Sequence, residues 1–273
     1  MRVGREIEAV VFDVDGTLLH AHDPGGVAGA TPIPGAAEAV DRARASGRRV
    51  MLFTNGSGRP PTEYASDLRS IGFEIADEEF MNPAVVAARY VARRYPGRTV
   101  LVLGGAGVVA PLRELGVETI EADRPAPAGV VLVGWDDAIS YAALRAACDS
   151  VWAGAPLLAT SVAPVFSVNG GRAPGWSGAI VAGIRQVTGA RAVTLGKPAV
   201  LALRESCRAL GVPPARTLVV GDDLDLELEM ARRAGAPTAL VLTGISSRAD
   251  VRARPADRRP GAVLADVSRL MFE

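Results

Sequence analysis

The stretch AVVFDVDGTLLH, from Ala9 to His20, places two aspartates directly after a short apolar run and directly before a glycine. Residues two apart on a strand point to the same side, so Asp13 and Asp15 can reach one site while Val14 points into the core. Gly16 then permits a tight turn that lets a ligand approach the backbone. Two carboxylates this close should differ in pKa unless a cation lies between them. The stretch therefore predicts either a metal site or an acid paired with a nucleophile.

Short runs rich in valine and leucine recur along the chain and alternate with segments of helical spacing. The runs are EAVVFDV, RRVMLFTN, RTVLVLGG, GVVLVGW, APLLATS, RTLVVGDD and TALVLTG. Unbroken apolar runs are typical of strands covered on both faces. Strands that alternate with helices predict an α/β fold with a Rossmann-like, doubly wound parallel sheet, and such sheets bind ligands beyond the carboxyl ends of their strands. Three runs end in polar residues at that edge: Asp13, the pair Thr54 and Asn55, and the pair Asp222 and Asp223.

Composition limits the classes of function. A chain of 273 residues is long enough for two modest domains, and its 30 basic and 30 acidic residues give no reason to expect nucleic acid or a membrane surface as partner. Cys148 and Cys207 form neither a zinc pattern nor a disulfide framework, which suits the cytoplasm. No segment approaches the ~20 apolar residues that span a bilayer. The expected partner is therefore a small molecule.

Four short motifs follow one another at the predicted strand ends. They are DVDGTL, FTNGS, GKP and VVGDDLDLE, at residues 13–18, 53–57, 196–198 and 219–227. This ordered set resembles the motifs of the haloacid dehalogenase (HAD) superfamily of phosphatases. Members that cleave carbon–halogen bonds usually lack the second aspartate, and the cation-pumping ATPases replace it. The presence of Asp15 therefore indicates hydrolysis of a phosphate ester.

The resemblance implies three groups of site residues. The catalytic pair is Asp13 as nucleophile and Asp15 as general acid/base. The phosphate-binding residues are Thr54, Asn55, Gly56 and Lys197, whose ammonium would neutralise phosphoryl oxygens and hold Asp13 ionised. The ligands of Mg²⁺ are Asp13, Asp15 through its backbone carbonyl, and Asp222, an oxygen-only set of the kind that Mg²⁺ prefers.

Each motif taken alone has an ordinary structural interpretation. The stretch DVDG can be a turn with solvated aspartates, and Thr54 with Asn55 can cap the helix PPTEYASDLRSIG. A lysine before a proline is usually solvated, and Asp222 with Asp223 can begin the helix LELEMARRAG, where acidic residues favour the helix dipole. The occurrence of all four in this order is what favours the functional interpretation.

The spacing of the motifs predicts where a second domain is inserted. The gap from Asp13 to Thr54 holds little more than one helix, whereas the gap from Thr54 to Lys197 is large enough for a smaller α/β domain. The expected division is a core at 1–82 and 191–273 with a cap at 83–190. That placement is called a C2 cap. The stretches PIPGAAEAV, YASDLRSIGF, VLVLGGAGV, GAPLLATS and GWSGAIVAGI resemble the NagD-like, or class IIA, branch, which includes nucleotide, p-nitrophenylphosphate, phosphoglycolate and pyridoxal-phosphate phosphatases.

Three departures from this branch are visible. The fourth motif ends in Leu226 and Glu227, where the branch has threonine and aspartate; a longer carboxylate can still hold a metal-bound water. The cap stretch TSVAP, Thr160 to Pro164, lacks the usual asparagine and acidic residue, which puts the usual ligands of the branch in doubt. The second motif reads Asn55-Gly56-Ser57 instead of Asn-Asn-Ser, a change that the backbone amide tolerates.

The sequence thus predicts a cytoplasmic, Mg²⁺-dependent phosphatase that acts on a small phosphorylated metabolite through an aspartyl-phosphate on Asp13. Two alternatives use the same fold: a phosphotransferase or phosphomutase that excludes water, and a catalytically silent binding protein. A homodimer through the cap is also expected. The charged segment 246–262 is expected to be an exposed connection to a last short strand, AVLAD.

Overall fold

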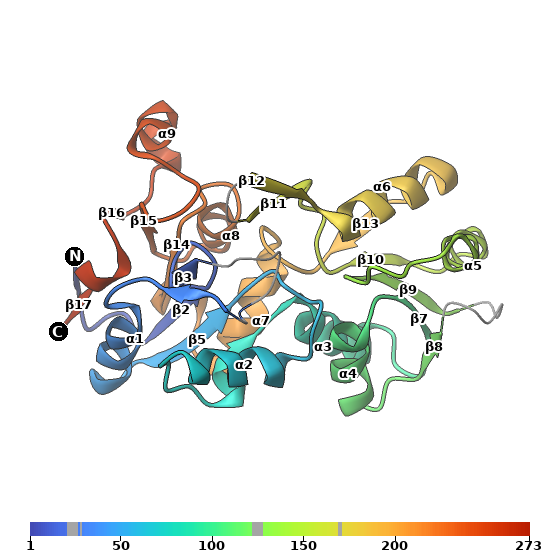
Figure 1. Ribbon diagram of the computed structural model, residues 1–273, viewed down its shortest axis with the longest axis horizontal. Helices are drawn as coiled ribbons and strands as arrows, with labels where there is room; N and C mark the ends of the chain where they lie inside the picture. Colours follow the sequence, from blue (N-terminus) through green and yellow to red (C-terminus); the bar gives the residue numbers. More distant parts are fainter. Residues whose placement is uncertain (21–26, 28, 122–127, 169–170) are drawn as a thin grey trace. The chain divides into compact units, whose positions relative to one another are not determined.

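Two sheets organise the chain in the computed structural model, which describes residues 1–20, 27, 29–121, 128–168 and 171–273 (Figure 1). The first unit, the core, comprises Met1–Thr54, Tyr64–Met81 and Lys197–Glu273. The second, the cap, comprises Asn55–Glu63 and Asn82–Gly196. The cap is thus inserted between parts of the core, and the predicted α/β architecture with a C2-type cap is confirmed.

The core contains a six-stranded parallel sheet. Its order is β16 (Ala262–Leu264), β15 (Thr238–Val241), β14 (Thr217–Gly221), β2 (Ala9–Asp13), β5 (Arg49–Phe53) and β6 (Phe80–Met81). All residues of β2 and β14 are buried, as expected for central strands whose apolar runs do not alternate with polar residues. The strand that ends at Asp13 is therefore held in the middle of the sheet. Asp15 lies two residues beyond its end, whereas the sequence predicted it on the strand itself.

Helices cover both faces of this sheet. The core helices are α1 (Ala36–Ala45), α2 (Pro61–Ser70), α7 (Val200–Leu210), α8 (Glu227–Ala234) and α9 (Arg248–Ala253). Alternate strand residues such as Val10 and Phe12 pack in one cluster with the apolar faces of α1 and α2, while α7 and α8 pack against each other and α8 packs against β14 and β15. This alternation is the doubly wound arrangement that the sequence predicted.

The cap has its own five-stranded parallel sheet. Its order is β13 (Ala192–Thr194), β10 (Leu157–Ala159), β9 (Val130–Val133), β7 (Val100–Leu103) and β8 (Thr119–Glu121). Its helices are α3 (Pro83–Arg94), α4 (Ala106–Glu114), α5 (Tyr141–Trp152) and α6 (Trp176–Thr188). Alternate residues of β7, β9 and β10 form an apolar cluster with α5 and α6. The cap therefore buries a core of its own.

The cap differs from the predicted range 83–190 in two segments. The strand β13 hydrogen-bonds to β10, so the cap extends to Gly196. The segment Asn55–Glu63, which follows the second motif, also belongs to it. One reason is that Ser57 donates a hydrogen bond from Oγ to Oγ1 of Thr160, at 3.2 Å.

Short strand pairs complete the fold. They are β1 (Arg2–Val3) with β17 (Met271–Phe272), β3 (Leu19–His20) with β4 (Thr31–Pro32), and β11 (Val165–Val168) with β12 (Gly171–Pro174). The last predicted strand, AVLAD, is confirmed as β16. The segment before it is not only an exposed connection, because Ser247 and Asp250 form a capping box that starts α9.

The buried guanidinium of Arg48 ties both ends of the described core together. Its five N–H groups donate to the carbonyl oxygens of Val3, Gly4, Ile7 and Glu273 and to Oγ of Ser46. A fully hydrogen-bonded buried cation of this kind is structural, since no donor remains for a ligand.

In the part of the chain that the structure describes, no helix is both long and apolar enough to cross a membrane. Cys148 and Cys207 are buried, and neither forms a disulfide.

Candidate active site

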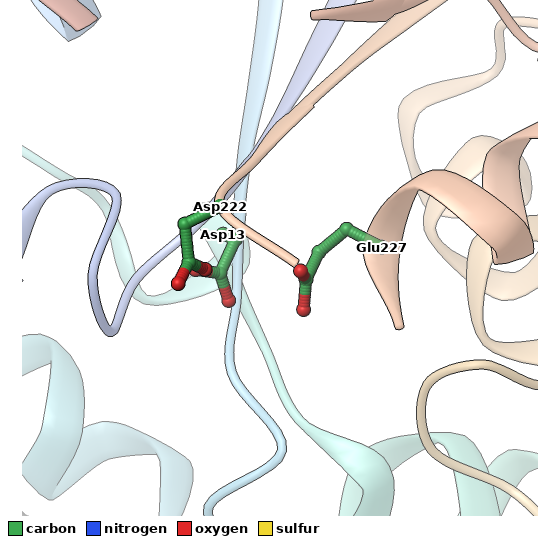
Figure 2. A group of neighbouring side chains, drawn as sticks. All are labelled: Asp13, Asp222 and Glu227. Carbon is green, nitrogen blue, oxygen red and sulfur yellow. The ribbon is translucent and has the colours of Figure 1, made fainter. Parts of the chain in front are cut away.

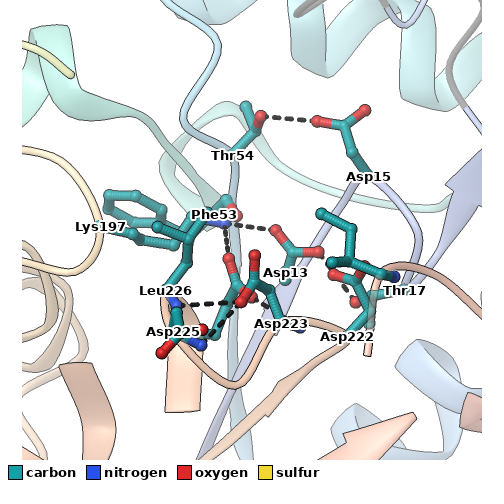
Figure 3. A network of polar contacts seen from close by, with 12 residues as sticks. Asp13, Asp15, Thr17, Phe53, Thr54, Lys197, Asp222, Asp223, Asp225 and Leu226 are labelled. Carbon is teal, nitrogen blue, oxygen red and sulfur yellow. Dashed lines mark hydrogen bonds and ion pairs between the residues drawn. The ribbon is translucent and has the colours of Figure 1, made fainter. Parts of the chain in front are cut away.

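Three of the predicted site residues lie at the carboxyl edge of the core sheet. The strand β2 ends at Asp13, Thr54 follows β5 directly, and Asp222 follows β14 directly. Because β2 lies between β5 and β14 and all three run parallel, their ends meet at one edge. Figure 3 shows these side chains together with Asp15 and Lys197.

The ammonium of Lys197 lies between two buried carboxylates. Its Nζ contacts Oδ1 of Asp13 and lies 2.6 Å from Oε1 of Glu227, and all three side chains are only 3% exposed. The other oxygen of Asp13, Oδ2, accepts a hydrogen bond from Oγ1 of Thr17 at 2.8 Å. Burial lowers the pKa of Lys197, but the charges of Asp13 and Glu227 outweigh burial and raise it. Lys197 is therefore a permanent positive charge beside Asp13.

Lys197 is also the only lysine of the chain; the other 29 of its 30 basic residues are arginines. A compact ammonium can contact two carboxylates at once, whereas a planar guanidinium imposes a fixed fork. This count is a signal in the sequence that distinguishes Lys197 independently of its motif.

The second motif aspartate, Asp15, faces Thr54 and not Lys197 (Figure 3). Oγ1 of Thr54 donates to Oδ2 of Asp15 at 2.9 Å. Burial and the negative charge of Asp13 raise the pKa of Asp15 to about 6. A carboxyl with this pKa can hold and release a proton near neutral pH, as a general acid/base must. The paired aspartates thus have different surroundings: Asp13 contacts an ammonium and Asp15 a hydroxyl.

Asp13, Asp222 and Glu227 form a group of carboxylates that can hold a metal ion (Figure 2). One oxygen of each lies within 4.8 Å of the others, and all three residues are buried. Burial and the charges of Asp13 and Glu227 raise the pKa of Asp222 well above its usual value. Burial raises the pKa of Glu227 to about 8, although Lys197 opposes the shift. A divalent cation relieves such crowding, and the all-oxygen donor set fits Mg²⁺.

The side chain of Asp15 is engaged with Thr54, so the group through which Asp15 would bind a metal is its backbone carbonyl. That assignment came from the resemblance and stays a prediction. Glu227, in contrast, was not among the predicted ligands or catalytic residues. The signal for it was its place as the last residue of the fourth motif, where it begins α8. Thr17, which directly follows Gly16 in the first motif, was missed as well.

The other two predicted phosphate-binding residues, Asn55 and Gly56, follow Thr54 in the chain but belong to the cap. Both are buried. Asn55 packs closely against the residue before Lys197, since a Cβ added at Gly196 would lie 2.7 Å from Oδ1 of Asn55. Their contact with phosphate stays a prediction.

The altered cap loop, Thr160 to Pro164, begins with two buried hydroxyls. Oγ1 of Thr160 accepts a hydrogen bond from Ser57, and Oγ of Ser161 accepts one from the amide of Ala163 at 3.2 Å. Val162, in contrast, is exposed. The polar groups of the loop are therefore used in hydrogen bonds within the cap, and the side chains that the loop exposes, Val162 and Pro164, are apolar.

Comparison with known protein families gives two matches. Residues 10–118 match the profile of a family described as haloacid dehalogenase-like hydrolase, and residues 194–270 match one described as HAD-hydrolase-like. Human chronophin is 33% identical over an alignment of 259 residues that covers 90% of this chain and 84% of that protein. These matches include all four motifs.

Two solved structures share the fold over nearly the whole chain. NagD from Escherichia coli K-12 superposes with a TM-score of 0.84 and 25% identity, and the match covers 96% of this chain and 98% of NagD. A glycerol phosphate phosphatase from Mycobacterium tuberculosis, solved in complex with magnesium, has a TM-score of 0.83 and 28% identity, covering 96% of this chain and 76% of that one.

Proposed function

Given that this chain belongs to the haloacid dehalogenase-like hydrolases and is a phosphatase, we propose that it hydrolyses a small phosphomonoester through an aspartyl-phosphate on Asp13, with Mg²⁺ as cofactor. The observation that carries the proposal is the difference between the paired aspartates. Asp13 contacts the ammonium of Lys197, whereas burial and the charge of Asp13 raise the pKa of Asp15 to about 6. One carboxylate is thereby suited to attack phosphorus and the other to carry a proton.

In the first step, a carboxylate oxygen of Asp13 attacks the phosphorus atom of the ester. The bond from phosphorus to the leaving oxygen breaks, and Asp15 gives its proton to that oxygen, so the alcohol leaves neutral. Lys197 stabilises the charge on the phosphoryl oxygens, because its ammonium is already fixed beside Asp13. Thr54, whose hydroxyl donates to Asp15, orients that carboxyl.

In the second step, Asp15 is ionised and accepts a proton from water as the water oxygen attacks phosphorus. The bond from phosphorus to Asp13 breaks, which releases phosphate and restores both aspartates. The Oγ1 of Thr17, 2.8 Å from Oδ2 of Asp13, keeps the carboxylate in one orientation through both steps. The same two side chains thus serve in turn, with no net change in protons on the protein.

Asp13, Asp222 and Glu227 would hold Mg²⁺, with the backbone carbonyl of Asp15 as the further predicted ligand. When bound, Mg²⁺ supplies positive charge that offsets the repulsion between the carboxylates and the phosphate dianion. The proposal is supported by the buried oxygen cluster and by the magnesium complex of the mycobacterial structural relative.

The names of the relatives suggest where to look for the substrate. Human chronophin and the mycobacterial glycerol phosphate phosphatase are relatives of this chain at 33% and 28% identity. We therefore propose a small phosphorylated metabolite, and glycerol 3-phosphate is a first member of the class to try. A cytoplasmic location, a homodimer through the cap and the absence of nucleic-acid and membrane partners stay predictions.

The test measures phosphate release from p-nitrophenyl phosphate, glycerol 3-phosphate, phosphoglycolate, pyridoxal phosphate and nucleotides, with and without Mg²⁺. Asp13→Asn should abolish release while its circular dichroism and Tm stay close to those of the unmodified protein. Asp137→Asn, a change at an exposed aspartate of the cap, is the matched control and should keep full activity. In Asp15→Asn, mass spectrometry should find a phosphoryl group on the peptide that contains Asp13.

Retained turnover in Asp13→Asn would sink the mechanism. If phosphate appears on an added alcohol and not in solution, the protein is a phosphotransferase, which uses the same residues. If the unmodified protein turns over no phosphomonoester of the panel, the silent binding protein becomes the better interpretation.

A further inference from the structure

The loop Thr243–Ser246, which follows β15, contacts both aspartate motifs of the core. Oγ1 of Thr243 donates a hydrogen bond to the carbonyl oxygen of Gly16 at 2.6 Å. Two residues later, the amide of Ile245 donates to Oδ2 of Asp222 at 2.7 Å. One loop therefore holds both the turn that follows Asp15 and the carboxylate of Asp222.

The order of the strands makes the Thr243 contact unusual. In the core sheet β15 neighbours β14, and β14 neighbours β2. The hydrogen bond from Thr243 to Gly16 thus joins the ends of two strands that are not adjacent, across the strand end that carries Asp222. No strand pairing fixes these two loops relative to each other, so the bond supplies a constraint that the sheet does not.

Ser246 fixes the same region from the backbone side. Its amide donates to the carbonyl oxygen of Asp222 at 3.0 Å, and its buried Oγ accepts a hydrogen bond from the amide of Leu224, also at 3.0 Å. The chain on both sides of Asp223 is therefore bonded to one serine.

Two glycines lie close against one side of the Asp222 carboxylate, at Oδ2. Gly16 has a φ of 82°, and a Cβ there would lie 2.6 Å from Oδ2 of Asp222 and 3.2 Å from Cα of Gly244. A Cβ at Gly244 would overlap the same carboxylate oxygen. The carboxylate thus lies against the two loops, and its position depends on how far apart they are held.

We propose that Thr243 and Ser246 are positioning residues of the phosphatase: they hold the Asp13–Gly16 turn and Asp222 at the separation that lets both aspartates share one cation. The proposal rests on the proposed function, which assigns that cation to Asp13 and Asp222. It gives a role to a segment outside the four motifs. Thr243 acts through Gly16, and Ser246 acts through the backbone of Asp222 and Leu224.

The test compares two variants with matched controls on the full chain. Thr243→Val removes the hydroxyl at nearly constant volume. Its control is Thr238→Val at the opposite end of β15, where Oγ1 accepts a hydrogen bond from the amide of Gly261 at 3.1 Å. Ser246→Ala is compared with Ser247→Ala, which removes the cap of α9. Thr243→Ser is the rescue variant, because it keeps the hydroxyl.

Three measurements distinguish positioning from general stability. Calorimetric titration with Mg²⁺ alone should give a Kd about 3- to 10-fold higher in Thr243→Val and Ser246→Ala, the loss expected for one intramolecular hydrogen bond. With p-nitrophenyl phosphate at saturating Mg²⁺, kcat should fall and KM should change little. Hydrogen exchange should speed up in the peptides 13–20 and 222–228. Thr243→Ser and both controls should behave like the unmodified protein.

The proposal fails if Thr243→Val lowers Tm no more than Thr238→Val does and leaves both the Mg²⁺ affinity and the exchange of the two peptides unchanged. It also fails if Thr243→Ser is as impaired as Thr243→Val. Hydrogen exchange needs neither metal nor substrate, so the constraint is tested even if the unmodified protein binds no Mg²⁺ or turns over no ester. An unmodified protein that turns over no ester would count against the proposed function alone.

Discussion

Replacing Lys197 by methionine should leave two buried carboxylates without their counter-charge. Nζ of Lys197 contacts Oδ1 of Asp13 and lies 2.6 Å from Oε1 of Glu227, and each side chain is 3% exposed. Removing one partner of a buried ion pair costs about 3–5 kcal/mol. In a chain of this size a loss of about 3–5 kcal/mol lowers Tm by about 6–20 °C.

The loss of Tm in Lys197→Met, relative to the unmodified protein, should grow as the pH rises. Without the ammonium, which lowers the pKa of Glu227, the pKa of that carboxyl in the folded variant lies still further above its unfolded value, so the folded form binds more protons than the unfolded form. The stability gained from those protons is fully present below the unfolded pKa and is lost as the pH rises through the folded pKa. Burial raises the pKa of Glu227 from 4.5 to about 8 even with Lys197 opposing the shift. In the unmodified protein the folded Glu227 also keeps its proton up to about pH 8, so both proteins lose this stability alike from pH 4.5 to about 8. The deficit in Tm of Lys197→Met should therefore grow as the pH rises above about 8.

A second substitution separates stability from catalysis. Lys197→Met with Glu227→Gln has one unpaired carboxylate fewer and should recover part of the lost Tm. It should recover no turnover, because the charge that stabilises the phosphoryl oxygens is still missing, an effect of about 10²- to 10³-fold in kcat. Differential scanning calorimetry at pH 6.5, 8 and 9.5 and phosphate release provide the two readouts. The reasoning is refuted if Lys197→Met melts with the unmodified protein at every pH, or if the double variant melts lower than Lys197→Met.

Three further substitutions follow from the same geometry. Burial and the charge of Asp13 raise the pKa of Asp15 to about 6. Phosphoenzyme formation, which needs protonated Asp15, should therefore slow as the pH rises through about 6. A rapid-quench pH profile measures this rate, and Asp15→Asn should remove the dependence on pH. Gly16→Ala should destabilise the fold by about 1–2 kcal/mol or more, because φ is 82° and the new Cβ would lie 2.6 Å from Asp222; urea unfolding measures the loss. Arg48→Met removes a guanidinium with five hydrogen-bonded N–H groups and should cost about 3 kcal/mol or more, yet leave the KM of the surviving folded enzyme unchanged; a change in KM would contradict a purely structural role.

The sequence predicted the strands because short unbroken apolar runs in an α/β protein are typical of strands in the interior of a sheet. All seven runs of this kind are strands, and β2 with Asp13 at its end is central in the core sheet. The strand β13 was not predicted. It is three residues long, it lies at the edge of the cap sheet, and Val193 at its centre is exposed, so neither of its faces requires an apolar run.

The sequence also predicted which residue types gather at the sheet edge, and the resemblance predicted that Lys197 would hold Asp13 ionised, a pairing that the structure shows. That Thr54 would contact Asp15 was not predicted, because it depends on side-chain directions that strand ends leave open. The hydrogen bond of Thr243 could not be predicted from the sequence for another reason. Its partner is the backbone carbonyl of Gly16, and every residue has such a carbonyl, so no residue type marks the partner.

The departure in the fourth motif shows how two substitutions can fit one site. Leu226 stands at the N-cap of α8 and has no side-chain oxygen to cap the helix. The backbone carbonyl oxygen of Asp223 accepts instead from the first-turn amide of Leu228 at 3.3 Å. Oδ1 of Asp223 accepts from the amides of Asp225 and Leu226 at 2.7 and 3.3 Å. The amide of Asp223 in turn donates to Oε2 of Glu227 at 3.2 Å, while Oε1 of Glu227 reaches Lys197. The longer carboxylate thus spans from the motif loop to the ammonium. A glutamate at this position is therefore compatible with an ordered site, since both of its oxygens have partners.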